Sequence, residues 1–552
     1  RDRVICSDKT GTLTQNRMTV VDFFGENEQE LAKAMALCCD AEIDDEGKVT
    51  GEPTEAALVT WANTLGLNKT ALKSSFPRCG EAPFDSGRKM MSTLHLAPNG
   101  VVQYTKGAPD VIIGKCTHYL KNGEAVPMTE DYRREILRSN KAMADKALRV
   151  LACALRIWSA QPDDCEPETL EQQLCFVGLT GMIDPVRPEV KDAIDECKAA
   201  GIRAIMITGD HVDTAVAIAK ELGILREGDR AVTGTQLSQM SDEEFEREFQ
   251  NISVYARVQP EHKTRIVSAW RKAGYVTAMT GDGVNDAPSI KSADIGVGMG
   301  ITGTDVTKNV ADMVLADDNF ATIVGAVEEG RRIYDNIRKA IQFLLGSNMS
   351  EVISIFVATI LGFTILKPVH LLWINLVTDC FPALALGMEK AEGDIMRRRP
   401  RPAKDGIFAG GMGFDIAYQG VLISVLVLAA YFVGHYIETG VWTITDSADG
   451  TTMAFLTMSM AEVCHSFNMR SLRGCIFTMG TKNKALVWAA VGSIAATTLV
   501  CEVPFLAEAF GFTPVSFAEY VIAMGIGMLG MVIVEIVKTF QRRAMRKRGE
   551  IL

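Results

Sequence analysis

The sequence lacks several features that would each indicate a particular class of protein. Basic residues are not in excess: 57 Lys and Arg stand against 68 Asp and Glu, for a formal net charge of −11. Nucleic-acid binding needs a clustered excess of Lys and Arg, so this charge argues against nucleic acid as the main partner. The 13 cysteines form no C-x-x-C motif, and we therefore expect reduced thiols rather than a disulfide framework.

Two nucleotide-binding signatures are also missing or uninformative. No G-x-x-x-x-G-K-[ST] motif is present, which argues against energy coupling through a P-loop. The stretch Gly298–Gly303 fits G-x-G-x-x-G, but it follows a segment better explained by phosphate chemistry, described below. No signal peptide precedes the first apolar segment, and the chain begins with Arg rather than Met.

Long apolar runs are absent before about Lys339 and frequent after it. Six segments have roughly the length of a membrane-spanning helix, about 20 residues. They are centred on 341–362, 370–388, 413–434, 453–468, 485–506 and 519–538. The fourth is the weakest candidate, because it is short and contains Glu462 and His465. We expect a charged soluble part followed by a membrane part.

The loops between these segments differ in charge. Lys and Arg are frequent after the second and fourth segments and in the C-terminal tail, whereas the loops after the third and fifth contain neither. Because cytoplasmic loops are enriched in Lys and Arg, six crossings place the soluble part and both ends of this chain in the cytoplasm.

The stretch "VICSDKTGTLTQNRMTV" predicts a buried strand that ends at Asp8. Ligand sites of open α/β sheets lie at the carboxyl ends of such strands, and a carboxylate can attack phosphorus as a nucleophile. A turn or a helix cap is the simpler explanation for any single Asp. Here, however, "IRAIMITGDH" ends another apolar strand with Thr208, Gly209 and Asp210, groups suited to holding phosphate oxygens.

Two further segments supply the remaining groups that phosphoryl transfer requires. Lys263 in "VQPEHKTRIV" provides a cation that can offset charge on a transferred phosphoryl group. "YVTAMTGDGVNDAP" ends a strand with Asp282, Asn285 and Asp286. Two carboxylates this close repel each other, and Mg2+ would relieve the repulsion while neutralising phosphate.

In this order, "DKTGTLT", "TGD", "DPVRPEV" and "TGDGVNDAP" resemble the P-type ATPases, ion pumps with a haloacid-dehalogenase-like phosphorylation domain. The resemblance implies that Asp8 is the phosphorylated nucleophile and that Thr10, Asp282 and the Asp8 carboxylate hold Mg2+. The other catalytic residues that it implies are Lys9, Thr208, Gly209, Asp210, Lys263 and Asp286, with Asn285 beside the nucleotide phosphates. Asp184 and Arg187 match the family's hinge; for Arg187 alone a surface salt bridge is an equal alternative.

About 160 residues separate the first strand from the next matching one, enough for an inserted domain. "GEPTEAALV", "PFDSGRKMM", "YTKGAPDVI" and "ALRVLACAL" resemble the nucleotide-binding domain of the same pumps. The resemblance implies that Phe84 stacks on the adenine of ATP, with Glu55, Lys89, Lys106 and Arg149 around the nucleotide. Without the family, Phe84 is better explained as a core residue and Lys106 as a solvated surface charge.

These observations give one expected fold. It is an α/β haloacid-dehalogenase-like phosphorylation domain (residues 1–18 and 179–335) with an inserted α+β nucleotide-binding domain (19–178). An all-α transmembrane domain of six helices, with a cytoplasmic tail, follows at 336–552.

Polar residues inside the apolar segments indicate an ion path, because such residues are costly in a membrane. Helical spacing places Asn348 with Glu351, and Asn375 with Thr378 and Asp379, while Glu462 lies in the fourth segment. These oxygen ligands suit Ca2+ better than copper or zinc. The segments resemble type II calcium pumps and their bacterial relatives, which implies Ca2+ export across a bacterial plasma membrane. Interhelical hydrogen bonds without transport are the simpler alternative, and the roles of His465 and Arg470 stay open.

By the same resemblance, an actuator domain and four earlier membrane helices should precede this chain as the missing N-terminal half of the pump. ATP, the transported cation and the lipid bilayer are the expected partners. A pump for Na+ or H+, a membrane-anchored phosphatase of the dehalogenase superfamily and a non-pumping fragment are the alternatives.

Overall fold

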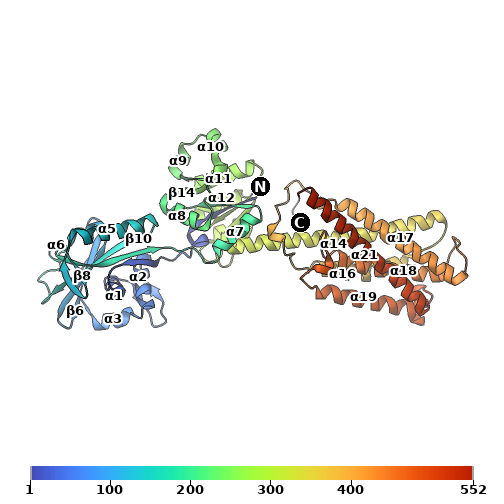
Figure 1. The fold of residues 1–552 in the computed structure, drawn as a ribbon, viewed down its shortest axis with the longest axis horizontal. Coiled ribbons are helices and arrows are strands. Elements are labelled where there is room, and N and C mark those ends of the chain that lie inside the picture. Colours follow the sequence, from blue (N-terminus) through green and yellow to red (C-terminus); the bar gives the residue numbers. More distant parts are fainter. Residues whose placement is uncertain (1–2, 550–552) are drawn as a thin grey trace. The chain divides into compact units, whose positions relative to one another are not determined.

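The computed structural model describes residues 3–549, which divide into two compact units. One unit comprises residues 3–195 and 202–323, and the other comprises 196–201 and 324–549. Each is described by itself below. Figure 1 gives the element labels used from here on.

The first unit contains a sheet of seven strands, all parallel, built from Val- and Ile-rich segments far apart in the sequence. Its order is β13 (Arg230–Thr233), β14 (Ile252–Ala256), β12 (Ile202–Ile207), β1 (Arg3–Asp8), β15 (Val276–Gly281), β16 (Ile295–Met299) and β17 (Met313–Leu315). Strand β1 is central, with Val4, Ile5 and Cys6 buried, as expected for a parallel strand covered on both faces. The predicted α/β organisation of the front part is confirmed.

Helices connect these strands. The principal ones are α7 (Val190–Ala199), α8 (Val212–Leu222), α11 (Pro260–Lys272), α12 (Ala287–Ser292) and α13 (Asp305–Val310). Helix α11 begins with Pro260, whose missing N–H costs nothing at that position, and it buries Trp270 against the sheet core. The helices thereby hold the carboxyl ends of β1, β12 and β15 at one edge of the sheet.

A second, mostly antiparallel sheet has the order β5 (Arg78–Asp85), β6 (Met90–Ala97), β7 (Gly100–Gly107), β10 (Arg149–Trp158), β11 (Leu174–Ile183), β8 (Cys116–Lys121) and β9 (Glu124–Pro127). An eighth strand, β2 (Thr19–Phe24), also pairs with β11. The helices α1 (Glu28–Leu37), α2 (Pro53–Thr64), α3 (Lys69–Ser75), α4 (Pro109–Lys115) and α5 (Glu130–Asp145) belong to this part. Strand β11 continues to Ile183, past residue 178, where the sequence places the domain boundary.

The second unit is helical. It contains most of α14 (Phe320–Leu361), then α15 (Pro368–Trp373), the π-helix η4 (Ile374–Asp379), α16 (Cys380–Leu386), α17 (Met412–Thr439), α18 (Ala448–Asn468), α19 (Lys484–Glu502), α20 (Pro504–Phe510) and α21 (Phe517–Lys547). Helix α18 packs against both α17 and α21, as the orange and red ribbons of Figure 1 show.

In the described part of the chain, five helices are long and apolar enough to cross a membrane: α14, the run Pro368–Leu386, α17, α19 and α21. Helix α18 is not among them, so the expected count of six stays a prediction. Neighbouring helices bury most of its side chains, and a helix shielded in this way can keep polar residues at little cost.

Candidate functional site

Asp8 lies at the carboxyl end of the central strand β1, where the backbone turns sharply. Its N–H donates to Oγ1 of Thr280, at the end of the neighbouring strand β15, at 2.8 Å. Residues Lys9–Leu13 form a single π-type turn in which Gly11 has φ +82°, a left-handed conformation that favours glycine. The turn leaves the Asp8 carboxylate at the edge of the sheet, where ligand sites of parallel sheets lie.

Lys263, on the first turn of α11, binds two carboxylates at once. Its Nζ donates to Oδ1 of Asp8 at 3.0 Å and to Oδ1 of Asp286 at 2.9 Å. Burial raises the pKa of Asp8 to about 7, and the charges of Asp286 and Asp282 add to this while Lys263 opposes it. Burial lowers the pKa of Lys263, but the two carboxylates outweigh it and raise this pKa overall. Lys263 therefore stays charged beside a carboxylate that titrates near neutrality.

Asp282 and Asp286 complete an acidic cluster with Asp8. One oxygen from each of the three lies within 4.8 Å of the others. Oδ2 of Asp286 accepts hydrogen bonds from the backbone N–H groups of Asp282 and Gly283, which fixes its orientation. Burial raises the pKa of Asp286, but the effects of Lys263 and of these N–H groups are larger, so this pKa is lowered overall. For Asp282, both burial and the charge of Asp286 raise the pKa. Closely spaced carboxylate oxygens are the donor set that Mg2+ prefers.

The segment after β12 brings Thr208, Gly209 and Asp210 to the same sheet edge. The N–H of Asp210 donates to Oγ1 of Thr208, and the Asp210 carboxylate pairs with the buried Lys9 at 2.5 Å. The hydroxyl of Thr10 lies 3.5 Å from Oδ2 of Asp210. A Cβ placed on Gly209 would have no atom within 4 Å, so the backbone there is open to a ligand.

Asp184 and Arg187 hold the turn that follows Asp8. Oδ2 of Asp184 accepts a hydrogen bond from Oγ1 of Thr14 at 2.6 Å. Arg187 donates to the carbonyl oxygens of Gly11 at 2.8 Å and Thr14 at 3.1 Å. Within residues 3–549, Arg187 thus binds backbone carbonyls of this turn and forms no surface salt bridge.

Lys106, on β7 of the second sheet, and Glu55, on α2, form a largely buried ion pair of 2.8 Å, with side chains 7% and 13% exposed. Burial lowers the pKa of Lys106, but the nearby Cys38, Cys39 and Glu55 groups raise it overall. Arg149 donates to Oγ1 of Thr54, the residue before Glu55, at 2.9 Å. The explanation of Lys106 as a solvated surface charge is therefore wrong, because the strand pairing of β7 buries it.

Phe84 is 63% exposed, which excludes the alternative explanation as a core residue. Strand register pairs Asp85 with Met90 and Met91 with Lys106, so Phe84 lies near the same end of the sheet as Lys106. Lys89 and Asn285 are also exposed, and within residues 3–549 their side chains form no hydrogen bond or ion pair. The structure gathers Glu55, Lys106 and Arg149 but does not bring Lys89 or Asn285 into contact with them.

A second acidic cluster lies among the helices of the other unit. Glu351 on α14, Asp379 at the end of η4 and Glu462 on α18 place one oxygen each within 4.8 Å of the others. All three are buried, at 7%, 2% and 0% exposure. Five of their six carboxylate oxygens are buried without a hydrogen-bond partner in the structure. Buried carboxylates are normally paired or bound to a cation, so these unpaired oxygens fit a cation.

The backbone at Asp379 departs from an α-helix. Residues Ile374–Asp379 form a π-helix, and Pro382, one turn later, has no N–H to offer the preceding turn. Within residues 3–549, Oγ1 of Thr378, the residue before Asp379, is buried without a hydrogen-bond partner. Asn348 and Asn375 are exposed. The structure therefore groups Glu351, Asp379 and Glu462, whereas the two predicted amide ligands lie at the surface of the described chain.

Two family models and several known proteins match this chain. Residues 27–189 match the family model described as P-type ATPase, cytoplasmic domain N, and residues 363–540 match that of the cation transporting ATPase C-terminus. The chain is 45% identical over 97% of its length to calcium-transporting ATPase 1 of Bacillus cereus, of which it covers 63%. A calcium-transporting ATPase of Listeria monocytogenes is 43% identical over 98% of the chain, with 62% of that protein covered.

The chain belongs to the P-type cation-transporting ATPases. The human calcium-transporting ATPase type 2C member 1 is a more distant relative, 34% identical over 98% of the chain and covered to 60%. The chain thus spans about three-fifths of the length of these relatives. Membership in this P-type family, together with the five apolar helices, identifies a multi-pass membrane protein.

Several polar residues of this P-type ATPase near the two clusters escaped the sequence prediction. Thr280 binds the N–H of Asp8, and the hydroxyls of Ser347, Ser354 and Ser459 are buried and unpaired. A signal was present: Ser347, Glu351 and Ser354 are spaced by four and three, and Ser459 precedes Glu462 by three, so each set shares a helix face. Both ring nitrogens of the buried His465 are also unpaired.

Proposed function

We propose that this chain is the catalytic and C-terminal membrane portion of a pump that uses ATP to export Ca2+ from the cytoplasm. The observation that carries the proposal is the group Glu351, Asp379 and Glu462, three buried carboxylates whose oxygens lie within 4.8 Å of one another. The carboxylates in such a group repel one another unless a cation or protons neutralise their charge. Hard oxygen ligands of this kind suit Ca2+. The names of the relatives support the same ion.

In the proposed reaction Asp8 is the nucleophile. A carboxylate oxygen of Asp8 forms a bond to the γ-phosphorus of ATP while the bond from that phosphorus to the bridging oxygen breaks, and ADP leaves with the electron pair. Lys263 offsets the charge that spreads over the transferred group. Thr208 and the open backbone at Gly209 hold its oxygens. Lys9 orients Asp210 through their ion pair.

The acidic cluster at the sheet edge fits Mg2+. Both oxygens of Asp286 accept hydrogen bonds, Oδ1 from Lys263 and Oδ2 from backbone N–H groups. Lys263 binds only Oδ1 of Asp8, so Asp8, through its other oxygen, with Asp282 and Thr10, would hold the metal. Bound there, Mg2+ would neutralise phosphate charge. Asp286 then acts through Lys263 and through the hydrogen bonds that it accepts from the backbone N–H groups of the preceding residues Asp282 and Gly283.

The second sheet supplies the nucleotide site. Phe84 presents an exposed ring on which adenine stacks. Lys89, Arg149, Asn285 and the buried Lys106–Glu55 pair surround the sugar and phosphates. Asp184 and Arg187 keep the hinge turn after Asp8 in place while the nucleotide domain moves.

In the membrane, α18 is the sixth spanning helix of the proposal, shielded from lipid by α17 and α21. The Lys- and Arg-rich loops then face the cytoplasm, in the plasma membrane of a bacterium. The rest of the pump, an actuator domain and four further helices, covers Asn348 and Asn375 and completes the Ca2+ site with them.

The test is ion-dependent phosphorylation. The chain is reconstituted with the N-terminal half of the pump, and acid-stable, hydroxylamine-sensitive label from γ-labelled ATP is measured against Ca2+, Na+ and pH. We expect label that requires Ca2+, disappears in Asp8→Asn and in Glu351→Gln, and persists in Glu508→Gln, which alters an exposed acid. Label that responds to Na+ or pH but not to Ca2+ would refute Ca2+ as the transported ion. Phosphate turnover without any ion dependence would indicate a phosphatase instead.

A further inference from the structure

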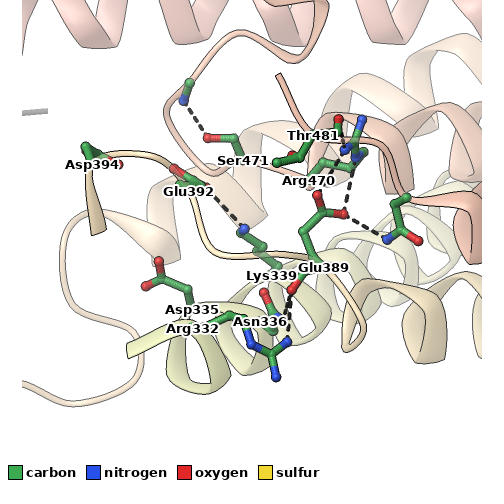
Figure 2. Close-up of polar contacts among 12 residues, drawn as sticks. Arg332, Asp335, Asn336, Lys339, Glu389, Glu392, Asp394, Arg470, Ser471 and Thr481 are labelled. Atoms are coloured by element: carbon green, nitrogen blue, oxygen red, sulfur yellow. Dashed lines mark hydrogen bonds and ion pairs between the residues drawn. The ribbon is translucent and has the colours of Figure 1, made fainter. Parts of the chain in front are cut away.

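Glu389 lies between α16 and α17 and is 1% exposed. Its carboxylate accepts two hydrogen bonds from Arg470, at 3.2 Å from Nε and 3.0 Å from Nη2. Nδ2 of Asn483 donates to the same carboxylate at 2.8 Å. Figure 2 shows Glu389 with Arg470 on one side and the side chains of Arg332 and Asn336 on the other.

The backbone of Glu389 makes a second set of bonds. Its carbonyl oxygen accepts from Nη1 of Arg332 at 3.0 Å and from Nδ2 of Asn336 at 2.8 Å, and both donors are on α14. One residue thus binds α14 through its carbonyl and the segment after α18 through its carboxylate. Neither set depends on a solvent-exposed side chain.

The helices that meet at Glu389 are the ones that bear the membrane carboxylates. Arg332 and Asn336 share α14 with Glu351. Glu389 follows α16, which begins directly after Asp379. Arg470 follows the last residue of α18, the helix of Glu462. A single buried residue, Glu389, therefore connects the three elements of the acidic cluster: it binds α14 through its backbone carbonyl and the segment after α18 through its carboxylate.

Asn483 strengthens this junction. It is the N-cap of α19, because its Oδ1 accepts from the N–H of Leu486, and its Nδ2 also donates to the carbonyl of Ala385 in α16. Arg470 in turn donates to the carbonyl of Thr481 at 2.8 Å. The Glu389 carboxylate is thus the centre of a bonded network that fixes the end of α16 against the loop after α18.

The loop between α16 and α17, which contains Glu389, has a second attachment, and among the helices of the cluster this attachment reaches α14. Lys339 pairs with Glu392 at 3.1 Å, and Arg398 pairs with Asp335 at 2.6 Å. These pairs hold the loop to α14 and involve no residue of α18. Glu389 differs from them because it adds the connection to Arg470.

We propose that Glu389 is a positioning residue for the cation site, which it keeps pre-organised by tying together the ends of the three elements that bear Glu351, Asp379 and Glu462. The inference rests on the proposed function, since it assumes that this cluster binds the transported cation. Ligands held in place before the ion arrives bind it more tightly, because less ordering accompanies binding. Loss of such a supporting contact lowers metal affinity by about tenfold or more.

The test measures Ca2+ binding by the whole chain in lipid nanodiscs, with radioactive Ca2+ and equilibrium dialysis. We expect Glu389→Gln to raise the dissociation constant about tenfold without changing the number of sites. Arg470→Lys, which keeps the charge but loses the two-bond geometry, should raise it less. If Glu389→Gln does not fold, Arg470→Lys still tests the proposal, because an unchanged dissociation constant in Arg470→Lys overturns it.

Asp415 provides a matched control. It is 2% exposed and pairs with Arg473, in the same loop as Arg470, and with Gln541 of α21. Asp415→Asn therefore breaks a comparable buried pair, which links the loop after α18 to α17 and α21, two helices that bear none of the three carboxylates. Its dissociation constant should stay within twofold of that of the unaltered chain. An equal rise in Asp415→Asn and Glu389→Gln would show a general loss of structure and overturn the proposal.

If the proposed function is wrong, the Ca2+-binding measurements give a different result. In that case the unaltered chain does not bind Ca2+, or Glu351→Gln binds it equally well. If Glu351→Gln abolishes binding while Glu389→Gln matches the unaltered chain, the positioning role alone is refuted.

Discussion

The ammonium nitrogen of Lys263 lies 3.0 Å from Oδ1 of Asp8, although 255 positions separate the two residues in the sequence. The contact arises because β1 ends at the sheet edge beside the first turn of α11. It joins the proposed nucleophile to the one side chain that also holds Asp286.

Lys263→Met should slow phosphorylation of Asp8 by about 100-fold or more, because loss of a charged group that stabilises the transition state has an effect of this size. The measurement is the initial rate of label incorporation from γ-labelled ATP in the reconstituted pump. Lys272→Met removes an exposed lysine from the same helix and should leave the rate unchanged. A normal rate in Lys263→Met would rule out the role given to this lysine.

Asp8→Asn should stabilise the chain as the pH rises. The pKa of Asp8 is about 3.8 when unfolded and about 7 when folded. Between these values the unfolded state has lost the proton that the folded state retains, so the free energy of unfolding falls with increasing pH, by up to about 1.4 kcal/mol per pH unit. The side chain in Asp8→Asn does not titrate. The difference in free energy of unfolding between this variant and the unaltered chain should therefore grow from pH 4 to pH 7 and then level off.

The check on this pH dependence is the thermal unfolding midpoint of both proteins without divalent cations. Asp131→Asn alters a side chain that is 97% exposed and serves as the control, whose midpoint should follow the unaltered chain at every pH. Parallel curves for Asp8→Asn and the unaltered chain would contradict the raised pKa.

Phe84→Ala should weaken ATP binding by about tenfold or more, because an aromatic ring that stacks on a base contributes about 1–3 kcal/mol. Its ring is 63% exposed, so the unfolding midpoint should change little. Binding is measured by calorimetry with the whole chain. Ile157→Ala, at a 75% exposed position of the same sheet, controls for loss of surface apolar area, and equal affinities in the two variants would exclude stacking on Phe84.

Asp379→Asn should stabilise the ion-free chain and remove its response to Ca2+. In the ion-free state three buried carboxylates crowd one another, and neutralising one relieves that repulsion. Ca2+ raises the unfolding midpoint of the unaltered chain by binding the folded state, whereas the variant should show little change. Glu508→Gln should respond as the unaltered chain does. A full Ca2+ response in Asp379→Asn would place the ion elsewhere.

Much of the fold follows from patterns that are local in the sequence. Apolar runs bounded by "SDKTG", "TGDH" and "TGDGVND" mark β1, β12 and β15, because a parallel strand buried on both faces is apolar throughout. Residue spacing in the apolar segments likewise placed Glu351 and Asp379 on the membrane helices. The apolar pattern is weakest at α18, whose shielding by α17 and α21 reduces the need for an apolar surface.

The sequence by itself determined which residues bear the chemistry: Asp8 at a strand end, Lys263 on a helix start and three carboxylates in apolar segments. Only the tertiary structure decided which of them touch. It paired Lys106 with Glu55, exposed Phe84, left Asn348 and Asn375 exposed and joined Glu389 to Arg470. The physical reason is that local patterns fix the face on which a side chain lies, whereas its partner depends on the packing of segments that are distant in the chain.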